Sequence, residues 1–290
     1  MIANSTAAGW VHVDLPGGSV VLTNANGGVS GGTWASPRGG GGANMGDHVG
    51  DDPGAVAANR ALLAGLLPPG CRAVWMNQIH SAICADAAGD GPSPEAPGEA
   101  AGRSAGAGTG RTAATSAPIP TADALLSTQA GLCPAVVVAD CVPLALLATD
   151  GSVAVAVHAG RAGLLVGVVA NAISAARQKL SPGARLQAVI GAHICAACYE
   201  VGPELARQVE PTHPHLVTTS RWGTPALDLA AGVRRELERA GVEIAYQSRQ
   251  CTQEDANYYS YRRSGPTGRQ ALIVIAQHAA QNHGKIPADS

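Results

Sequence analysis

Runs of apolar residues separated by short polar breaks dominate the chain from about residue 124 onward. Short apolar runs bounded by turn residues are typical of buried strands, whereas apolar residues recurring every three or four positions are typical of helices with one buried face. On this basis we predict strands near 135–139, 144–149, 153–158, 186–192 and 270–276. Helical spacing predicts helices near 54–66, 163–180, 202–210 and 228–241.

The N-terminal part carries shorter patterns. Residues 11–23 predict a strand pair that turns at Pro16-Gly17-Gly18, because Pro and Gly fit tight turns. Asp51-Asp52-Pro53 has the residue types of a helix start and precedes the first predicted helix. The segment "RAVWMNQIH", residues 72–80, predicts a strand that ends at His80.

Residues 87–118 have almost no large apolar side chain and are rich in Gly, Pro, Ala and Ser. Such a stretch buries too little surface to offset its ordering entropy, so we expect a disordered insertion within one domain whose core spans about 11–278. Elsewhere, strands and helices alternate without a regular strand–helix–strand order. This pattern predicts an α+β fold, a layered α/β sandwich with mixed sheets.

Composition narrows the function classes. The 290 residues are 46% hydrophobic with a formal net charge of −2, which gives no general attraction to nucleic acid or anionic membranes. No apolar run approaches the ~18 to 20 residues of a membrane span, and the N-terminus lacks a signal-peptide pattern. We therefore expect a cytoplasmic protein. Its seven cysteines lack framework spacing, which favours thiols or metal ligands over disulfides.

One cysteine and one histidine lie at the ends of otherwise unreactive strands. Residues 150–152 predict an antiparallel hairpin whose paired residue numbers sum to about 301 or 302, which sets His158 opposite Pro143 or Leu144. Cys141 lies two or three residues further along, so the two side chains can converge at the open end of the hairpin. Either the histidine activates the cysteine as a nucleophile, or both bind a transition metal.

A third donor would favour the metal, and His80 is the candidate. Three protein ligands leave the fourth tetrahedral position of a zinc ion for water, as in catalytic rather than structural sites. Spacing alone does not bring His80 to Cys141, because 61 residues separate them. Buried, packed side chains therefore stay an alternative at this point.

Several segments carry a family resemblance in order and character. They are "GGVS", "NMGDHVGDDPGAVAANR", "NQIHS", "DALLSTQAGLCPAVVVADCVPLALL", "VAVHAG", "ACYEVGPEL", "LDLAAGVRRELERAGV" and "CTQEDANYYSYRRSGPTGRQALIVI". Over roughly residues 20–277, apart from the insertion, the chain resembles the laccase-domain (YfiH-type) purine nucleoside phosphorylase family, formerly labelled multicopper polyphenol oxidase.

The resemblance implies a single laccase-type domain and a zinc enzyme that cleaves adenosine, inosine, guanosine and methylthioadenosine with phosphate and also deaminates adenosine. The family's metal ligands fall on His80, Cys141 and His158, which are thus the implied catalytic residues. Zinc is implied in preference to Cu²⁺, and neither nucleic acid, membrane nor protein partner is implied. The rivals are a metal-free cysteine hydrolase or deamidase using Cys141 and His158, and a copper-dependent polyphenol oxidase.

Substrate contacts follow from the chemistry. Phosphorolysis needs an anion pocket, and the backbone from Gly160 with the Arg161 and Arg262 side chains could provide one. Asp140 could orient a metal-bound imidazole or bond a ribose hydroxyl. The last two candidates carry amides suited to recognising a base or ribose, namely Asn44 and Gln78.

Two segments depart from the family pattern. Ala25 stands where the family usually has an arginine before "GGVS", and "HAGRAG" replaces the usual "HAGWRG", so that Ala162 occupies the arginine position. Two cationic contacts to phosphate that the resemblance would imply are therefore missing or displaced by one residue, whereas all three implied metal ligands are present. Packing or loop roles are expected for Cys195-x-x-Cys198, which lacks a second such pair, and for Cys251, His48, His213 and His215.

Overall fold

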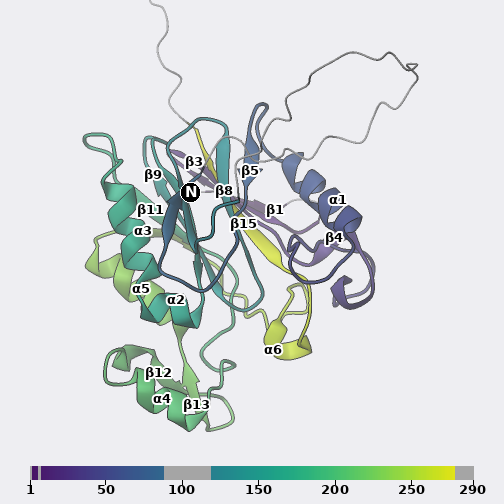
Figure 1. Cartoon of the computed structure of the whole chain (residues 1–290), viewed down its shortest axis with the longest axis vertical. Helices are drawn as coiled ribbons and strands as arrows, with labels where there is room; N and C mark the ends of the chain where they lie inside the picture. Colours follow the sequence, from purple (N-terminus) through teal and green to yellow (C-terminus); the bar gives the residue numbers. More distant parts are fainter. Residues whose placement is uncertain (1, 6–7, 88–118, 278–290) are drawn as a thin grey trace, which may run out of the picture.

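The computed structural model describes residues 2–5, 8–87 and 119–277, so nearly all of the predicted insertion lies outside the described residues. Two six-stranded sheets pack face to face, and helices cover their outer faces (Figure 1). Most strand pairs are antiparallel, and β5–β8, β6–β7 and β11–β14 are parallel. The predicted layered α/β fold with mixed sheets is confirmed.

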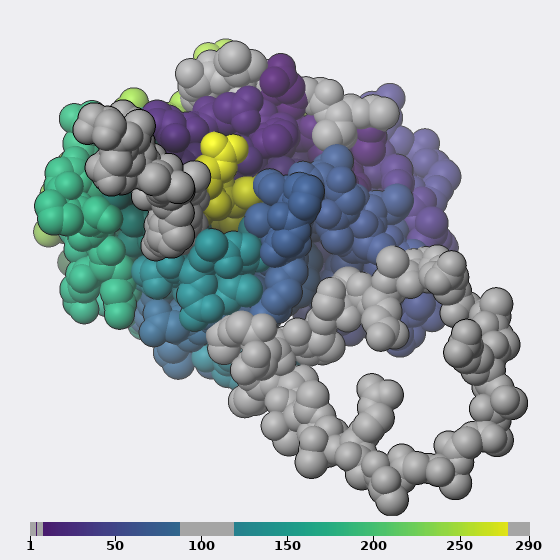
Figure 2. Space-filling model, turned by 90° about the horizontal axis from the view of Figure 1, so that it is seen from above, coloured from purple at the N-terminus to yellow at the C-terminus, as the bar shows by residue number. Residues whose placement is uncertain are grey.

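The first sheet consists of β1 (Ile2–Ser5), β2 (Val11–Leu15), β3 (Gly18–Leu22), β15 (Gln270–Ala276), β8 (Leu132–Val138) and β5 (Arg72–Val74), in that order. The second consists of β14 (Glu243–Gln247), β11 (Leu186–Ile190), β9 (Val142–Ala148), β10 (Ala154–Ala159), β7 (Ala124–Ser127) and β6 (Cys84–Asp86). Short strands outside them are β4 (Asn26–Ser30) and the pair β12 (Val217–Thr219) and β13 (Pro225–Leu227). Seen from above, the C-terminal described residues (yellow) lie between N-terminal residues (purple) and blue and teal residues (Figure 2), in agreement with the place of β15 between β3 and β8.

The helices are α1 (Pro53–Ala64), α2 (Arg161–Leu165), α3 (Val168–Arg177), α4 (Pro203–Val209), α5 (Leu229–Arg239) and α6 (Tyr261–Ser264), with single 3₁₀ turns at Gly32–Trp34 and Pro214–Leu216. Asp52 caps α1 through a hydrogen bond from the Gly54 N–H, and Pro53 is its first residue, as the start signal predicts. The single helix predicted over 163–180 is wrong. Gly167, with φ of 90°, divides it into α2 and α3, because this left-handed backbone cannot continue a helix.

The central strands are buried on both faces. In β9, Leu144 and Leu146 face the helices α3 and α5, whereas Ala145 and Leu147 face the first sheet. The other face of the first sheet packs against α1 and Trp10. This explains the nearly continuous apolar runs in the sequence, since a strand covered on both sides has no solvent face to mark with polar residues.

The hairpin register agrees with prediction, since His158 pairs with Pro143 in the β9–β10 ladder. The strand predicted over 72–80 is wrong beyond Val74. Residues 75–80 leave the sheet, and His80 has a φ of 60°, which an extended strand does not allow. Among the described residues, no helix combines the length and hydropathy needed to cross a bilayer.

Leu146 tests the two-sided burial. We expect Leu146→Ala to lower the free energy of unfolding by about 2–5 kcal/mol, because the side chain is fully buried between β9 and the helices and its removal leaves a cavity. Urea denaturation at fixed metal content measures the change. Leu62→Ala on α1, where the side chain is 47% exposed, should change it by less than about 0.5 kcal/mol. Equal losses in both variants would contradict this packing.

Candidate metal centre and substrate cavity

His80, Cys141 and His158 lie together at one end of the second sheet. One ligand atom from each falls within 4.8 Å of the others. Cys141 Sγ is 3.9 Å from His80 Nε2, and the two imidazole rings have centroids 4.7 Å apart. The β9–β10 hairpin explains the closeness of Cys141 and His158, because Cys141 directly precedes β9 and His158 is near the end of β10.

Asp123 holds His80 close to Cys141 and His158. This residue was not among the candidates predicted from the sequence. It is fully buried just before β7. Its carboxylate accepts hydrogen bonds from the backbone N–H groups of Ile79, His80 and Ser81 and from the Ser81 hydroxyl. The His158 Nδ1 atom lies 2.8 Å from Asp123 Oδ1. One carboxylate therefore fixes the positions of both histidines.

The Asp123–His158 contact also selects the imidazole tautomer. An ionised carboxylate only accepts hydrogen bonds, so His158 donates from Nδ1 and leaves Nε2 for a ligand. Burial alone would raise the pKa of Asp123, but hydrogen bonds from His158 and Ser81 hold the pKa well below its usual range. The carboxylate is therefore ionised throughout the physiological pH range.

Backbone strain is concentrated at this site. Among the described residues other than glycine, only His80 and Asp140 have positive φ, at 60° and 90°. Asp140 is held by hydrogen bonds from Thr252 Oγ1 (2.6 Å) and the Arg262 backbone N–H (2.7 Å). Such conformations persist only where surrounding contacts fix them, and here they set the directions of His80 and Cys141.

Gly160 leaves room for the cluster. A Cβ atom at this position would lie 2.6 Å from His80 Cδ2 and 3.1 Å from Cys141 Sγ, which is closer than packed atoms allow. The glycine predicted for phosphate binding therefore has a steric role beside the two side chains. The helix α2 that follows it is a single short turn, so its dipole is small.

The electrostatics suit a metal. Burial raises the pKa of the Cys141 thiol, but His158 and His80 outweigh this effect and lower the pKa to about 6. Two imidazole nitrogens and an ionisable thiol, all within 4.8 Å of one another, match the mixed N and S donors that zinc accepts. These side chains therefore fit a zinc ion with one position left for a further ligand.

A cavity of about 420 Å³ opens onto the cluster. Ligand pockets of this kind range from roughly 300 to 1,000 Å³, so the cavity is large enough for a small organic molecule. Its walls include all three cluster residues together with His48, Gln78, Val137, Asp140, Ile194, Tyr199, Tyr261, Arg262 and Arg269. A further cavity of about 530 Å³ between α3 and α5 lies away from this cluster.

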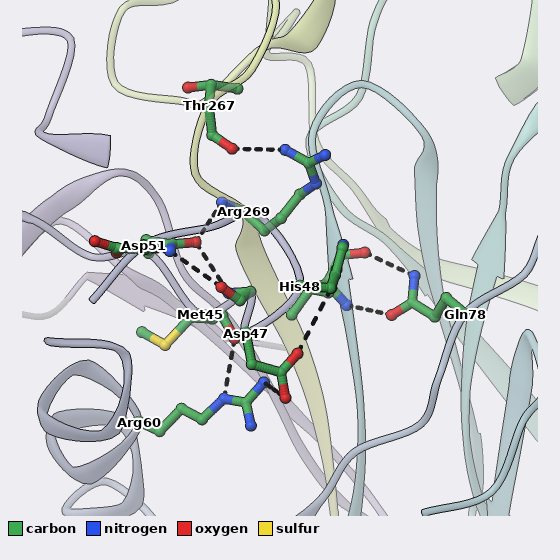
Figure 3. Close-up of polar contacts among 11 residues, drawn as sticks. Met45, Asp47, His48, Asp51, Arg60, Gln78, Thr267 and Arg269 are labelled. Carbon is green, nitrogen blue, oxygen red and sulfur yellow. Dashed lines mark hydrogen bonds and ion pairs between the residues drawn. The ribbon is translucent and has the colours of Figure 1, made fainter. Parts of the chain in front are cut away.

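Two arginines bring positive charge to the cavity. Arg262 Nη1 donates to the Glu200 carbonyl, and its guanidinium lies 4.9 Å from the Tyr199 ring centroid. Arg269 Nη1 is held by the carbonyls of Thr267 and Gly268, as Figure 3 shows for Thr267. Arg269, which the sequence analysis did not single out, belongs to the "TGR" segment quoted for the resemblance.

The side-chain amides of Gln78 and Asn44, which we predicted to contact a base or ribose, form hydrogen bonds with the backbone of the protein itself. Gln78 forms paired hydrogen bonds with the backbone N–H and carbonyl of Val137 (Figure 3). Asn44 is fully buried, does not line the cavity, and accepts from the Arg269 backbone N–H. Asn44 therefore positions the chain at Arg269, and Gln78 fixes a cavity wall to β8.

Other sequence candidates lie around the site. Arg161 lies near the Tyr199 hydroxyl, where it and Arg262 oppose the effect of burial, which raises the pKa of Tyr199. Of the histidines assigned to loops, His48 reaches the cavity, while His213 and His215 lie together by the 3₁₀ turn at 214–216. Ala25 is fully buried and Ala162 is exposed, and neither lines the cavity.

Comparisons with known proteins agree with this arrangement. Residues 19–277 match the family model described as multi-copper polyphenol oxidoreductase laccase. Purine nucleoside phosphorylase SCO2081 of Streptomyces coelicolor is 42% identical over 80% of this chain and 86% of the relative. Purine nucleoside phosphorylase Cgl2154/cg2365 of Corynebacterium glutamicum is 40% identical over 88% of this chain and 92% of the relative.

Solved structures give the same result. Neisseria meningitidis protein NMB0706 has a TM-score of 0.72 at 29% identity, covering 92% of this chain and 99% of its own. YlmD from Geobacillus stearothermophilus has a TM-score of 0.73 at 28% identity, covering 95% and 99%. With a model match over almost all of the described core and relatives at 40% identity or more, the chain belongs to the YfiH-type laccase-domain family, as its sequence motifs predict.

Proposed function

We propose that the protein is a zinc-dependent purine nucleoside phosphorylase that converts adenosine, inosine, guanosine or methylthioadenosine and phosphate into the free base and a ribose 1-phosphate. The observation that carries the proposal is the His80–Cys141–His158 cluster opening onto a cavity with two arginines. The names of the curated relatives support the same reaction. A cytoplasmic location stays a prediction.

In this proposal, His80, Cys141 and His158 hold the zinc ion, which when bound supplies a Lewis acid able to activate a water molecule or a substrate oxygen at neutral pH. Asp123 keeps His158 in the tautomer that presents Nε2. Asp140 and Gly160 determine the direction and space available to Cys141 and His80. The same metal would serve the adenosine deaminase activity that we propose alongside phosphorolysis.

Phosphate binding falls to Arg262 and Arg269 in this proposal. Breaking the bond between ribose and base places positive charge on the sugar in the transition state, so phosphate must be held close to C1′. Guanidinium groups bind phosphate through charge-assisted hydrogen bonds. The aromatic ring of Tyr199 and the apolar side chains of Val137 and Ile194 offer a surface for a purine.

A metal-free cysteine hydrolase is the second candidate, and the lowered pKa of Cys141, about 6, supports it. His158 and Asp123 would then complete a nucleophile–base–carboxylate arrangement. The two candidates differ in their response to chelation. A nucleophilic cysteine works without metal, whereas a zinc enzyme does not.

Metal analysis and product identification test the first candidate. Purified protein should contain zinc at this site and form adenine from adenosine only when phosphate is present, with inosine as the product of deamination. His80→Ala should lower both activities by at least about a hundredfold, because it removes one of three metal ligands. Activity retained after chelation, and lost on alkylation of Cys141, would support the cysteine hydrolase instead.

Asp123→Asn tests the positioning role of the buried carboxylate. We expect zinc affinity to fall about 10- to 100-fold, because the variant loses the charge that fixes His158 and the 79–81 backbone. Competition with a chromophoric chelator measures this affinity independently of activity. Asp86→Asn, on the exposed side of β6, is the matched control and should leave the affinity unchanged. Unchanged affinity in both variants would contradict the role of Asp123.

A further inference from the structure

A second group of metal-binding side chains lies outside the cluster described above. Cys195, Cys198, Cys251 and Glu254 each place one ligand atom within 4.8 Å of the others. We propose that these four residues bind a second zinc ion with a structural role. The sequence shows only one C-x-x-C pair, but in the fold "CTQE", residues 251–254, takes the place of the second pair, with a glutamate in its last position.

The two segments form matched turns. In the first, the backbone N–H groups of Cys198 and Tyr199 both donate to the Cys195 carbonyl, at 3.0 Å each. In the second, the N–H groups of Glu254 and Asp255 donate to the Cys251 carbonyl, at 3.1 and 2.9 Å. Each turn therefore presents its first and fourth side chains to the same point, as the paired turns of structural zinc sites do.

Backbone contacts hold the two turns together. The Cys195 N–H lies 3.3 Å from Cys251 Sγ, and the Thr252 N–H donates to the His193 carbonyl at 3.0 Å. Cys198 and Cys251 are buried, Cys195 is partly buried and Glu254 is exposed. The site is therefore enclosed on the sulfur side, and its carboxylate edge gives a metal ion access from solvent.

Arg221 supplies charge where thiolates would need it. Its Nη2 atom lies 3.0 Å from Cys198 Sγ and also pairs with Glu254. A guanidinium directed at a buried sulfur is favourable when that sulfur carries negative charge. Three thiolates and one carboxylate around a divalent ion leave a net charge of about −2, which Arg221 partly neutralises.

The ligand set selects zinc. Thiolates favour soft or borderline ions, and four protein ligands complete a tetrahedral site with no position for substrate. Ligands about 2.3 Å from a tetrahedral ion lie roughly 3.8 Å apart, so the observed grouping needs only small shifts. Binding exchanges the three thiol protons, which pass to water, for Zn–S bonds, so no oxidant is required.

The site adjoins the cavity without sharing a ligand with the first cluster. Tyr199 follows Cys198 and lines the cavity, and Thr252 follows Cys251 and bonds Asp140. A zinc ion bound by Cys198 and Cys251 would restrict the motion of Tyr199 and Thr252, which follow these ligands in the sequence. Its structural role is to stiffen the cavity wall that carries Tyr199 and Arg262.

A variant that lacks the first cluster isolates the second site. We expect His80→Ala/Cys141→Ser, purified with a reductant, to retain about one zinc per chain by elemental analysis, with mainly sulfur neighbours at about 2.3 Å by X-ray absorption. The wild type should hold about two. Because this variant is inactive under the proposed function, the result does not depend on the reaction.

Substitutions then locate the ion. In the same background, Cys195→Ser and Glu254→Gln, which alter a partly buried and an exposed ligand, should each lower zinc affinity at least about tenfold. The matched control is Cys84→Ser, which alters a partly buried cysteine on β6 and should leave the zinc affinity unchanged. The proposal would be overturned if the His80→Ala/Cys141→Ser protein held no zinc. It would also be overturned if protein purified with a reductant contained a disulfide among these three cysteines.

Discussion

A single buried carboxylate connects three distant segments of this molecule. Asp123 binds the 79–81 backbone, the His158 ring and the Ser81 hydroxyl at once, while its own carbonyl accepts from the His158 N–H at 2.7 Å. An ionised group with no solvent contact is stable only if it is fully hydrogen-bonded. The backbone of His80 and the ring of His158 therefore stabilise the buried charge, and the same hydrogen bonds fix the positions of both residues.

The sequence predicted the part of the site that depends on local geometry. Hairpin register follows from turn length, so residues 150–152 alone limit the partner of His158 to Pro143 or Leu144, and the structure has Pro143. The approach of His80 could not, because a carboxylate 43 residues further along the chain determines it. Likewise, the break between α2 and α3 depends on one left-handed glycine, whose conformation the apolar pattern does not reveal.

The second cysteine group likewise depends on contacts between segments that are distant in the sequence, which is why the sequence alone did not reveal it. A lone C-x-x-C in a sequence shows two ligands, and its completing residues lie 56 positions away on a different turn. The source of the positive charge at the cavity also could not be inferred from the positions where the family motif places its arginines. Positions 25 and 162 are alanines, while Arg262 and Arg269 reach the cavity from α6 and from the segment before β15. The cavity therefore carries two arginines although positions 25 and 162 are alanines.

The place of β15 in the first sheet has a consequence for how the chain is made. This strand, residues 270–276, pairs on one side with β3 and on the other with β8, so it closes a gap between segments synthesised much earlier. During vectorial synthesis on the ribosome, that sheet stays in two halves with exposed edges until the strand has emerged from the exit tunnel. Until residues 270–276 are available, the facing edges of β3 and β8 stay unpaired and are open to pairing with other strands.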